Sequence, residues 1–108
     1  MEEFVKIVVY VPENQVEIIR ETLAKEGAGK IGNYDSCCFI CEGYGYWKPL
    51  EGSNPKIGKK NKVSKEKEFR IEVICNKKDY ERVVKKIREV HEYEEPAIDV
   101  YPLLNKVG

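Results

Sequence analysis

The segment around His91 concentrates side chains that could hold a metal ion. His91 is the only histidine of the chain, and Glu94 and Glu95 follow it closely. Imidazole nitrogen and carboxylate oxygen are ligands that suit divalent ions such as Ni²⁺ and Cu²⁺. A histidine at the end of a helix can instead interact with the last free backbone carbonyls. The sequence therefore offers His91, Glu94 and Glu95 as candidate metal ligands, with helix capping as the alternative.

Groups that could perform catalysis are scarce elsewhere in the sequence. No serine or cysteine lies in a recognisable nucleophile setting. A chain with one histidine has few ways to move protons between reacting groups. We therefore predict that the chain is not an enzyme.

Three cysteines, Cys37, Cys38 and Cys41, form a second group of candidate ligands. Cys38 and Cys41 make a C-x-x-C pair, but on a straight strand these positions point to opposite faces. Cys37 and Cys41 share a face, where Cys75 of a partner strand could join them. Small buried cysteines are also common core residues. We favour core packing and keep a cysteine metal site as the alternative.

A glycine pattern and an aromatic cluster could each bind a nucleotide. Gly27 to Gly32 spells G-x-G-x-x-G, but it follows a predicted helix, whereas a dinucleotide fingerprint follows a strand and opens a helix. Tyr44, Tyr46 and Trp47 could stack on a base, although aromatic residues on strands more often pack in a core or at a subunit contact. Because 19 Lys and Arg residues balance 19 Asp and Glu residues, the net charge attracts neither nucleic acid nor anionic membranes, and we predict neither partner.

Hydrophobic periodicity divides the chain into six elements that would position these groups. β-branched and aromatic runs predict strands over 4–11, 36–47, 65–75 and 97–103, and helical spacing predicts helices over 13–27 and 80–90. Gly43 and Gly45 predict a bulge or bend in the second strand. Prolines and glycines over 48–62 predict a long loop. The order predicts an α+β, ferredoxin-like βαββαβ sandwich, an antiparallel sheet with both helices on one face, as a single domain over residues 1–108.

The face of the sheet that the two helices do not cover carries several apolar residues. Alternate residues of the first strand, from Val5 onward, should face the helices. The opposite face of such a sheet is normally polar, so an apolar patch there indicates an interface between copies of the chain. The predicted interface residues are Phe4, Val8, Tyr10, Ile40 and Ile74.

The N-terminal residues do not resemble a targeting segment. MEEFVKIVVYVP opens with acidic residues and contains a short apolar run, unlike a signal peptide. No stretch approaches the roughly 20 apolar residues of a membrane span. We therefore predict a cytoplasmic protein that binds no membrane and keeps its cysteines reduced.

Two long motifs resemble a known family. GAGKIGNYDSCCFICEGYGYWKPLEGSNPKIG (Gly27–Gly58) and HEYEEPAIDVYPL (His91–Leu103) are similar to the insert, or YqfO-type, domain of the Ngg-interacting-factor-three-like family. The opening KIVVYVPENQVEIIRETL is similar too, although Glu92 stands where the family pattern usually has proline. With Trp47 added, the candidate cleft residues are Gly29, Gly32, Asn33, Tyr34, Gly43, Gly45, Trp47, Pro49, Gly52, Pro55, Gly58, Tyr93 and Pro96.

The resemblance implies an assembly and a mode of action. In complete family members this domain interrupts a larger domain with a dinuclear metal site, which we expect to be absent here. The domain itself resembles the CutA and PII proteins, ferredoxin-like trimers that are linked to divalent cations or bind regulatory ligands between subunits. We therefore expect a non-catalytic homotrimeric binding or regulatory module with a small-molecule or protein ligand at an inter-subunit cleft. The alternatives are a CutA-type protein that binds a divalent metal as cofactor and, last, a metal-dependent hydrolase.

Overall fold

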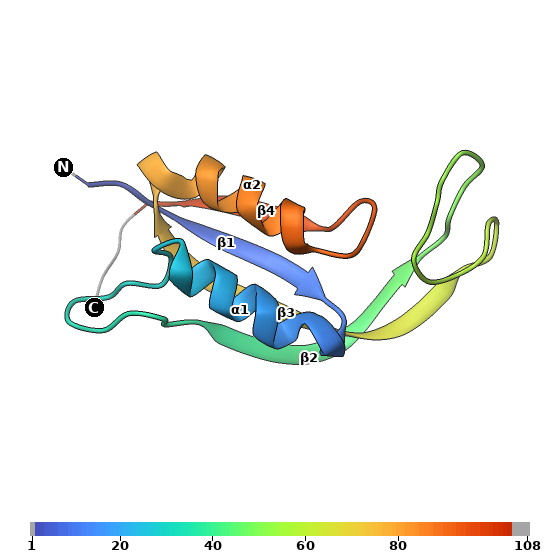
Figure 1. Cartoon of the computed structure of the whole chain (residues 1–108), viewed down its shortest axis with the longest axis horizontal. Helices are drawn as coiled ribbons and strands as arrows, with labels where there is room; N and C mark the ends of the chain where they lie inside the picture. Colours follow the sequence, from blue (N-terminus) through green and yellow to red (C-terminus); the bar gives the residue numbers. More distant parts are fainter. Residues whose placement is uncertain (1, 105–108) are drawn as a thin grey trace.

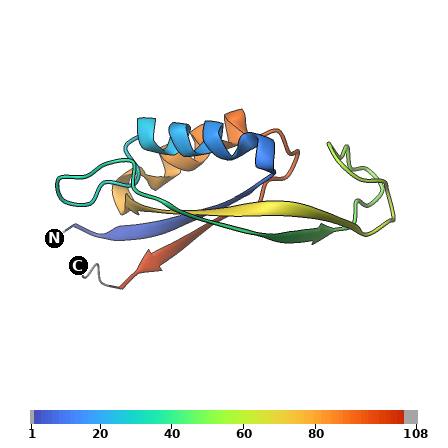
Figure 2. The same ribbon diagram turned by 90° about the horizontal axis from the view of Figure 1, so that it is seen from below.

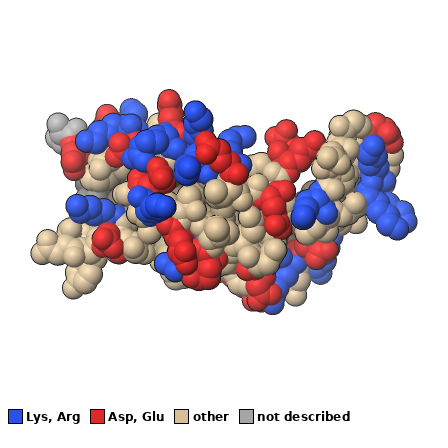
Figure 3. Space-filling view, in the orientation of Figure 1, with Lys and Arg blue, Asp and Glu red and all other residues tan. Residues whose placement is uncertain are grey.

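The predicted ferredoxin-like architecture is confirmed in the computed structural model, which describes residues 2–104. Antiparallel strands form one sheet in the order β2–β3–β1–β4, and both helices cover the same face of it (Figure 1, Figure 2). Figure 3 shows basic and acidic side chains interspersed over the helical layer. The elements are β1 (Phe4–Val11), α1 (Val16–Lys25), β2 (Phe39–Trp47), β3 (Ser64–Asn76), α2 (Tyr80–Val90) and β4 (Ile98–Leu103), with short 3-10 turns at Glu13–Gln15 and Lys77–Asp79.

Helix α1 ends at a glycine stop. Gly27 has φ +92°, a left-handed conformation that glycine adopts without steric cost. Its N–H donates to the Ala24 carbonyl, and the Ala28 N–H donates to the Leu23 carbonyl, each at 3.0 Å. These two bonds form a Schellman motif, which satisfies carbonyls at the end of the helix. Within the described residues, no helix is long and apolar enough to cross a membrane.

The hydrophobic core lies between the helices and the facing side of the sheet. Val5, Ile7, Val9 and Val11 of β1 are at most 3% exposed, which confirms the predicted inward face of this strand. In β3, alternate residues from Ile71 to Cys75 face the same side. The helices contribute Ile19, Leu23, Val83 and Ile87, all essentially inaccessible to solvent.

Among residues 2–104, no element covers the opposite face of the sheet (Figure 2). Val8 lies at its centre, opposite Glu72 of β3 and Asp99 of β4. Neighbouring side chains on the sheet already cover Val8 completely, and Ile74 is 7% exposed. Phe39, in contrast, is 67% exposed beside Glu72. The exposed apolar surface of this face therefore lies near the edge strand β2, rather than at Val8.

One residue of the predicted interface lies on the wrong face. Ile40 pairs with Ile71 and packs against the core on the helical side. The sequence analysis placed Ile40 on the open face, and the register turns it to the helical side and Phe39 outward. A shift of one residue along a strand exchanges its two faces, so Phe39 replaces Ile40 as the β2 residue of the open face.

The hairpin of β2 and β3 extends as an arm beyond the rest of the sheet (Figure 1). β1 pairs with β3 no further than Phe69, whereas β2 continues to pair until Trp47 meets Ser64. The ladder is continuous through Gly43 and Gly45, so these glycines form no bulge, although the hairpin changes direction where the arm begins (Figure 1). We call this two-stranded extension the arm, and the loop over 48–63 that closes it has neither helix nor strand.

Candidate functional site

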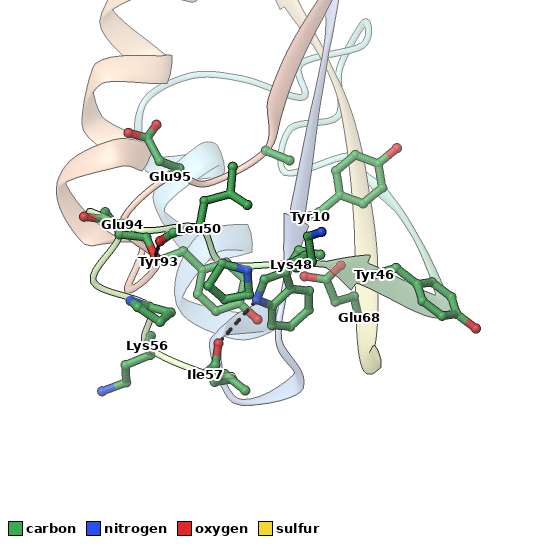
Figure 4. Close-up of a pocket in the computed structure, with 15 residues that line it drawn as sticks. Tyr10, Tyr46, Lys48, Leu50, Lys56, Ile57, Glu68, Tyr93, Glu94 and Glu95 are labelled. Atoms are coloured by element: carbon green, nitrogen blue, oxygen red, sulfur yellow. Dashed lines mark hydrogen bonds between the residues drawn. The ribbon is translucent and has the colours of Figure 1, made fainter. Parts of the chain in front are cut away.

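A cavity of about 420 Å³ lies at the base of the arm, between the loop after β2 and the turn that joins α2 to β4 (Figure 4). We call it the arm pocket. Its volume falls within the usual range for small-molecule sites, which are mostly apolar with a few well-placed polar groups. The residues that define the arm pocket here are Tyr10, Trp47, Leu50, Ile57, Glu68 and Tyr93.

Trp47 and Tyr93 join the two halves of the arm pocket. Their ring centroids are 6.1 Å apart, with the ring planes tilted by 46°. The Trp47 indole N–H donates to the Ile57 carbonyl at 3.3 Å, which folds the loop back toward the ring (Figure 4). The backbone N–H of Asn54 donates to the Glu94 carboxylate at 2.9 Å. The loop is thus tied to a turn 40 residues further along the chain.

His91 supports the turn from its buried side and is 7% exposed. Its Nε2 lies 2.9 Å from the Tyr10 carbonyl oxygen, and its Nδ1 accepts the Tyr93 backbone N–H at 3.1 Å. A carbonyl oxygen can only accept, so Nε2 carries the hydrogen and Nδ1 uses its lone pair for Tyr93. Neither ring nitrogen of His91 is left to bind a metal.

The structure does not bring His91, Glu94 and Glu95 together as a metal set, and their role as ligands stays a prediction. Both ring nitrogens of His91 have partners, and one carboxylate oxygen of Glu94 accepts the Asn54 N–H. Among residues 2–104, no group of three or more His, Cys, Asp and Glu side chains is arranged to hold a metal ion. A divalent cation as cofactor finds no fitting donor set in the described part of this chain.

The cysteines follow the core-packing interpretation in part, and all four are free. Cys75 lies in the core and Cys38 packs against it, while Cys41 is exposed. Burial raises the pKa of the Cys38 and Cys75 thiols, which keeps them protonated. Cys41 does not share a face with Cys75, because the register of β2 turns Cys41 to the open face opposite Arg70, whereas Cys75 lies in the core.

Two polar groups of the arm pocket lack partners. The hydroxyl oxygen of Tyr93 is buried and has no hydrogen-bond partner among the described residues. Burial, reinforced by the nearby carboxylates of Glu68, Glu92 and Glu66, raises the pKa of Tyr93 to about 12, so the phenol is neutral. Burial also raises the pKa of the Glu68 carboxyl.

Some of the candidate cleft residues line the arm pocket, and the others lie elsewhere in the structure. Trp47, Pro49, Pro55 and Tyr93 line it. Gly52 and Gly58 belong to its loop, and Pro96 to its turn. Gly43 and Gly45 line a second, adjoining hollow on the open face of the hairpin, which also contains Glu68. Four candidates, Gly29, Gly32, Asn33 and Tyr34, lie in the loop between α1 and β2, at the opposite end of the molecule (Figure 1).

Sequence reasoning missed Glu68 as a functional candidate. It reads as one of the charged residues that alternate with apolar residues along β3. The available signal was its position across the hairpin from the glycines of β2, since Gly43 is its pairing partner. Glycine has no side chain to compete for the space above the strand, so the Glu68 side chain lies across Gly45.

Comparison with known proteins confirms the family resemblance. No model of a protein family matches the chain. The "GTP cyclohydrolase 1 type 2 homolog" of Halalkalibacterium halodurans is 44% identical over 105 residues, which are 97% of this chain and 28% of that protein. The structure of a Bacillus cereus protein related to NIF3 matches with a TM-score of 0.85 and 41% identity, over 96% of this chain and 26% of that one. The chain thus spans little more than a quarter of the length of these relatives.

A smaller protein shares the fold over most of its length. The periplasmic divalent cation tolerance protein CutA of Archaeoglobus fulgidus matches with a TM-score of 0.71 and 20% identity, over 99% of this chain and 88% of that one. At this identity the match shows the fold alone, and it confirms the ferredoxin-like, CutA-like architecture.

Proposed function

From its relationship to a segment of the GTP cyclohydrolase 1 type 2 homologs and from its CutA-like fold, we propose that the chain is a non-catalytic binding module that assembles with copies of itself. The observation that carries the binding role is the arm pocket. It joins Trp47 of the first family motif to Tyr93 of the second, and rings from distant segments enclose a cavity of about 420 Å³.

The chemistry of the arm pocket favours binding over catalysis. Its one nearby histidine has both ring nitrogens occupied in holding the turn. The Tyr93 phenol stays neutral at physiological pH. No other side chain of the pocket is a nucleophile paired with a base. We place this module in the cytoplasm, where its free cysteines stay reduced.

The open face of the sheet supports self-assembly. It carries Val8, Ile74 and the exposed ring of Phe39 without a covering element in this chain. A copy of the same chain is the occupant that the resemblance to CutA-like trimers implies, and threefold symmetry follows from the same resemblance. We propose a homotrimer in which Phe4, Val8, Tyr10, Phe39 and Ile74 lie at the subunit contacts.

The binding role can be tested with the Trp47 indole, the only indole of the chain. Its N–H gives a single, unambiguous nuclear magnetic resonance signal. We expect that members of a library of small aromatic compounds shift this signal, because the cavity has room for one ring beside Trp47. Compounds that bind but perturb only residues around Tyr34, at the other end of the molecule, would contradict the arm pocket as the binding site.

A further inference from the structure

We propose that the arm pocket takes a small organic cation, an ammonium or guanidinium group carried on an apolar body. This inference rests on the proposed binding function and names its ligand class. The geometry that points to it is an unpaired carboxylate, that of Glu68, set beside the aromatic rings of one cavity.

Glu68 is a half-buried carboxylate without a counter-ion. Among the described residues it has neither an ion-pair nor a hydrogen-bond partner. Its neighbour on the same face of β3, Arg70, is engaged elsewhere, by Glu72 at 2.9 Å and by the Tyr10 hydroxyl at 3.0 Å. A charge removed from water is costly unless it is paired. A bound cation would supply the counter-ion that Glu68 lacks among the described residues.

The Glu68 side chain lies across the hairpin, over Gly45 of the neighbouring strand β2. A methyl group on Gly45 would collide with the Glu68 carboxylate. At this position β2 carries no side chain, and the Glu68 side chain borders both the arm pocket and the adjoining hollow. This placement holds the carboxylate at the cavity wall, rather than leaving it in bulk solvent.

The aromatic groups around Glu68 suit a cation as well. Trp47 and Tyr93 both line the cavity, and the faces of such rings attract ammonium and guanidinium groups. The Glu68 carboxylate and the ring faces together form a set complementary to an organic cation.

The basic residues of the arm pocket do not reverse this preference. Lys48 and Lys56 also line it, but both are exposed residues with long, flexible stems, and neither forms an ion pair with Glu68. Glu94 and Glu95 add two acidic groups to the lining. The titratable and charged groups that surround Glu68 in the two cavities are Tyr10, Cys41, Glu42, Tyr44, Tyr46, Lys48, Lys56, Arg70, Tyr93, Glu94 and Glu95.

A matched series of probes tests the charge preference through Trp47 fluorescence. Phenethylammonium, phenethyl alcohol and phenylacetate share a ring and differ in charge. We expect phenethylammonium to bind at least roughly tenfold more tightly than the alcohol, since a charge-assisted hydrogen bond is about twice as strong as a neutral one. Phenylacetate should bind most weakly. Affinity for the ammonium probe should fall on acidification at a pH above the ordinary glutamate range, because burial raises the pKa of Glu68.

Two variants assign the effect to one carboxylate. Glu68→Gln should bind the ammonium probe and the alcohol about equally, and it should remain folded because it removes a carboxylate whose ionisation burial opposes. Glu66→Gln, two residues along the same strand and exposed, should keep the preference. An unchanged preference in Glu68→Gln would overturn the assignment.

The outcomes separate this inference from the proposed function. If the alcohol or phenylacetate binds as tightly as the ammonium probe, the arm pocket is a binding site and only the inferred charge preference fails. If none of the three probes changes Trp47 fluorescence, and the compound library also leaves the indole signal in place, both the inference and the binding function fail.

Discussion

Val8→Lys is expected to convert the assembled protein into folded single chains. Val8 lies at the centre of the open face, between Glu72 and Asp99. Neighbouring side chains cover Val8 itself, but no element among residues 2–104 lies over this face, so the longer lysine side chain can extend past them to water beside the two carboxylates. In the proposed assembly the same charge would be buried against another subunit, at a desolvation cost of several kcal/mol per ion. Light scattering should therefore report the mass of one chain, with an unchanged far-ultraviolet circular dichroism spectrum.

Two further variants make this experiment decisive. Phe39→Lys places the charge at the 67% exposed edge of the same face, where it cannot disturb the core, and it should also weaken assembly. Ile18→Lys, on the 51% exposed side of α1, should leave the mass unchanged. A wild-type protein with the mass of one chain, or a Val8→Lys protein with the wild-type mass, would contradict assembly through the open face.

Gly29→Ala should destabilise the fold far more than Gly27→Ala. Both glycines have positive φ, +85° and +92°, which costs a side chain about 1–2 kcal/mol. A methyl group on Gly27 meets open space, whereas one on the buried Gly29 would clash with the Cys37 backbone carbonyl and crowd its N–H at 2.9 Å. Crowding of this kind adds roughly 1–3 kcal/mol. The free energies of unfolding in urea, measured at one protein concentration, should show this difference.

Equal losses in the two glycine variants would contradict the structural role of Gly29. That role is backbone packing, because the Gly29 N–H donates to Ile74 at 2.7 Å and its carbonyl accepts from Cys37 at 2.9 Å. The sequence motif marked Gly29 as a cleft candidate. The structure instead makes it the point where the loop after α1 joins β3.

Local patterns were sufficient to predict the architecture and the inward face of β1. Alternation in β1 is strict, and Gly27 stops α1 with a motif that depends on a few adjacent residues. The facing of β2 was not predictable in the same way. Its residues Cys37 to Cys41 are apolar or weakly polar on both faces, so alternation gives no direction and only the pairing of Ile40 with Ile71 decides it.

The site was predictable only as two separate motifs. Trp47 and Tyr93 each belong to a recognisable stretch, but their contact depends on how the loop folds back through the Ile57 carbonyl and the Asn54–Glu94 bond. His91 was read as a ligand because its two hydrogen-bond partners, the Tyr10 carbonyl and the Tyr93 N–H, are backbone groups. All residue types except proline have the same backbone groups, so the sequence could not show that both ring nitrogens of His91 have hydrogen-bond partners.

The central claim, a self-assembling module with a ligand in the arm pocket, is tested most directly by native mass spectrometry of protein isolated without denaturation from the cells that make it. We predict a species of three times the 12.5 kDa chain mass that carries a non-covalent small-molecule adduct. The adduct should disappear in Trp47→Ala and persist in Tyr34→Ala, which removes an exposed ring at the other end of the molecule. A single chain without an adduct, or an adduct that survives in Trp47→Ala, would contradict the account.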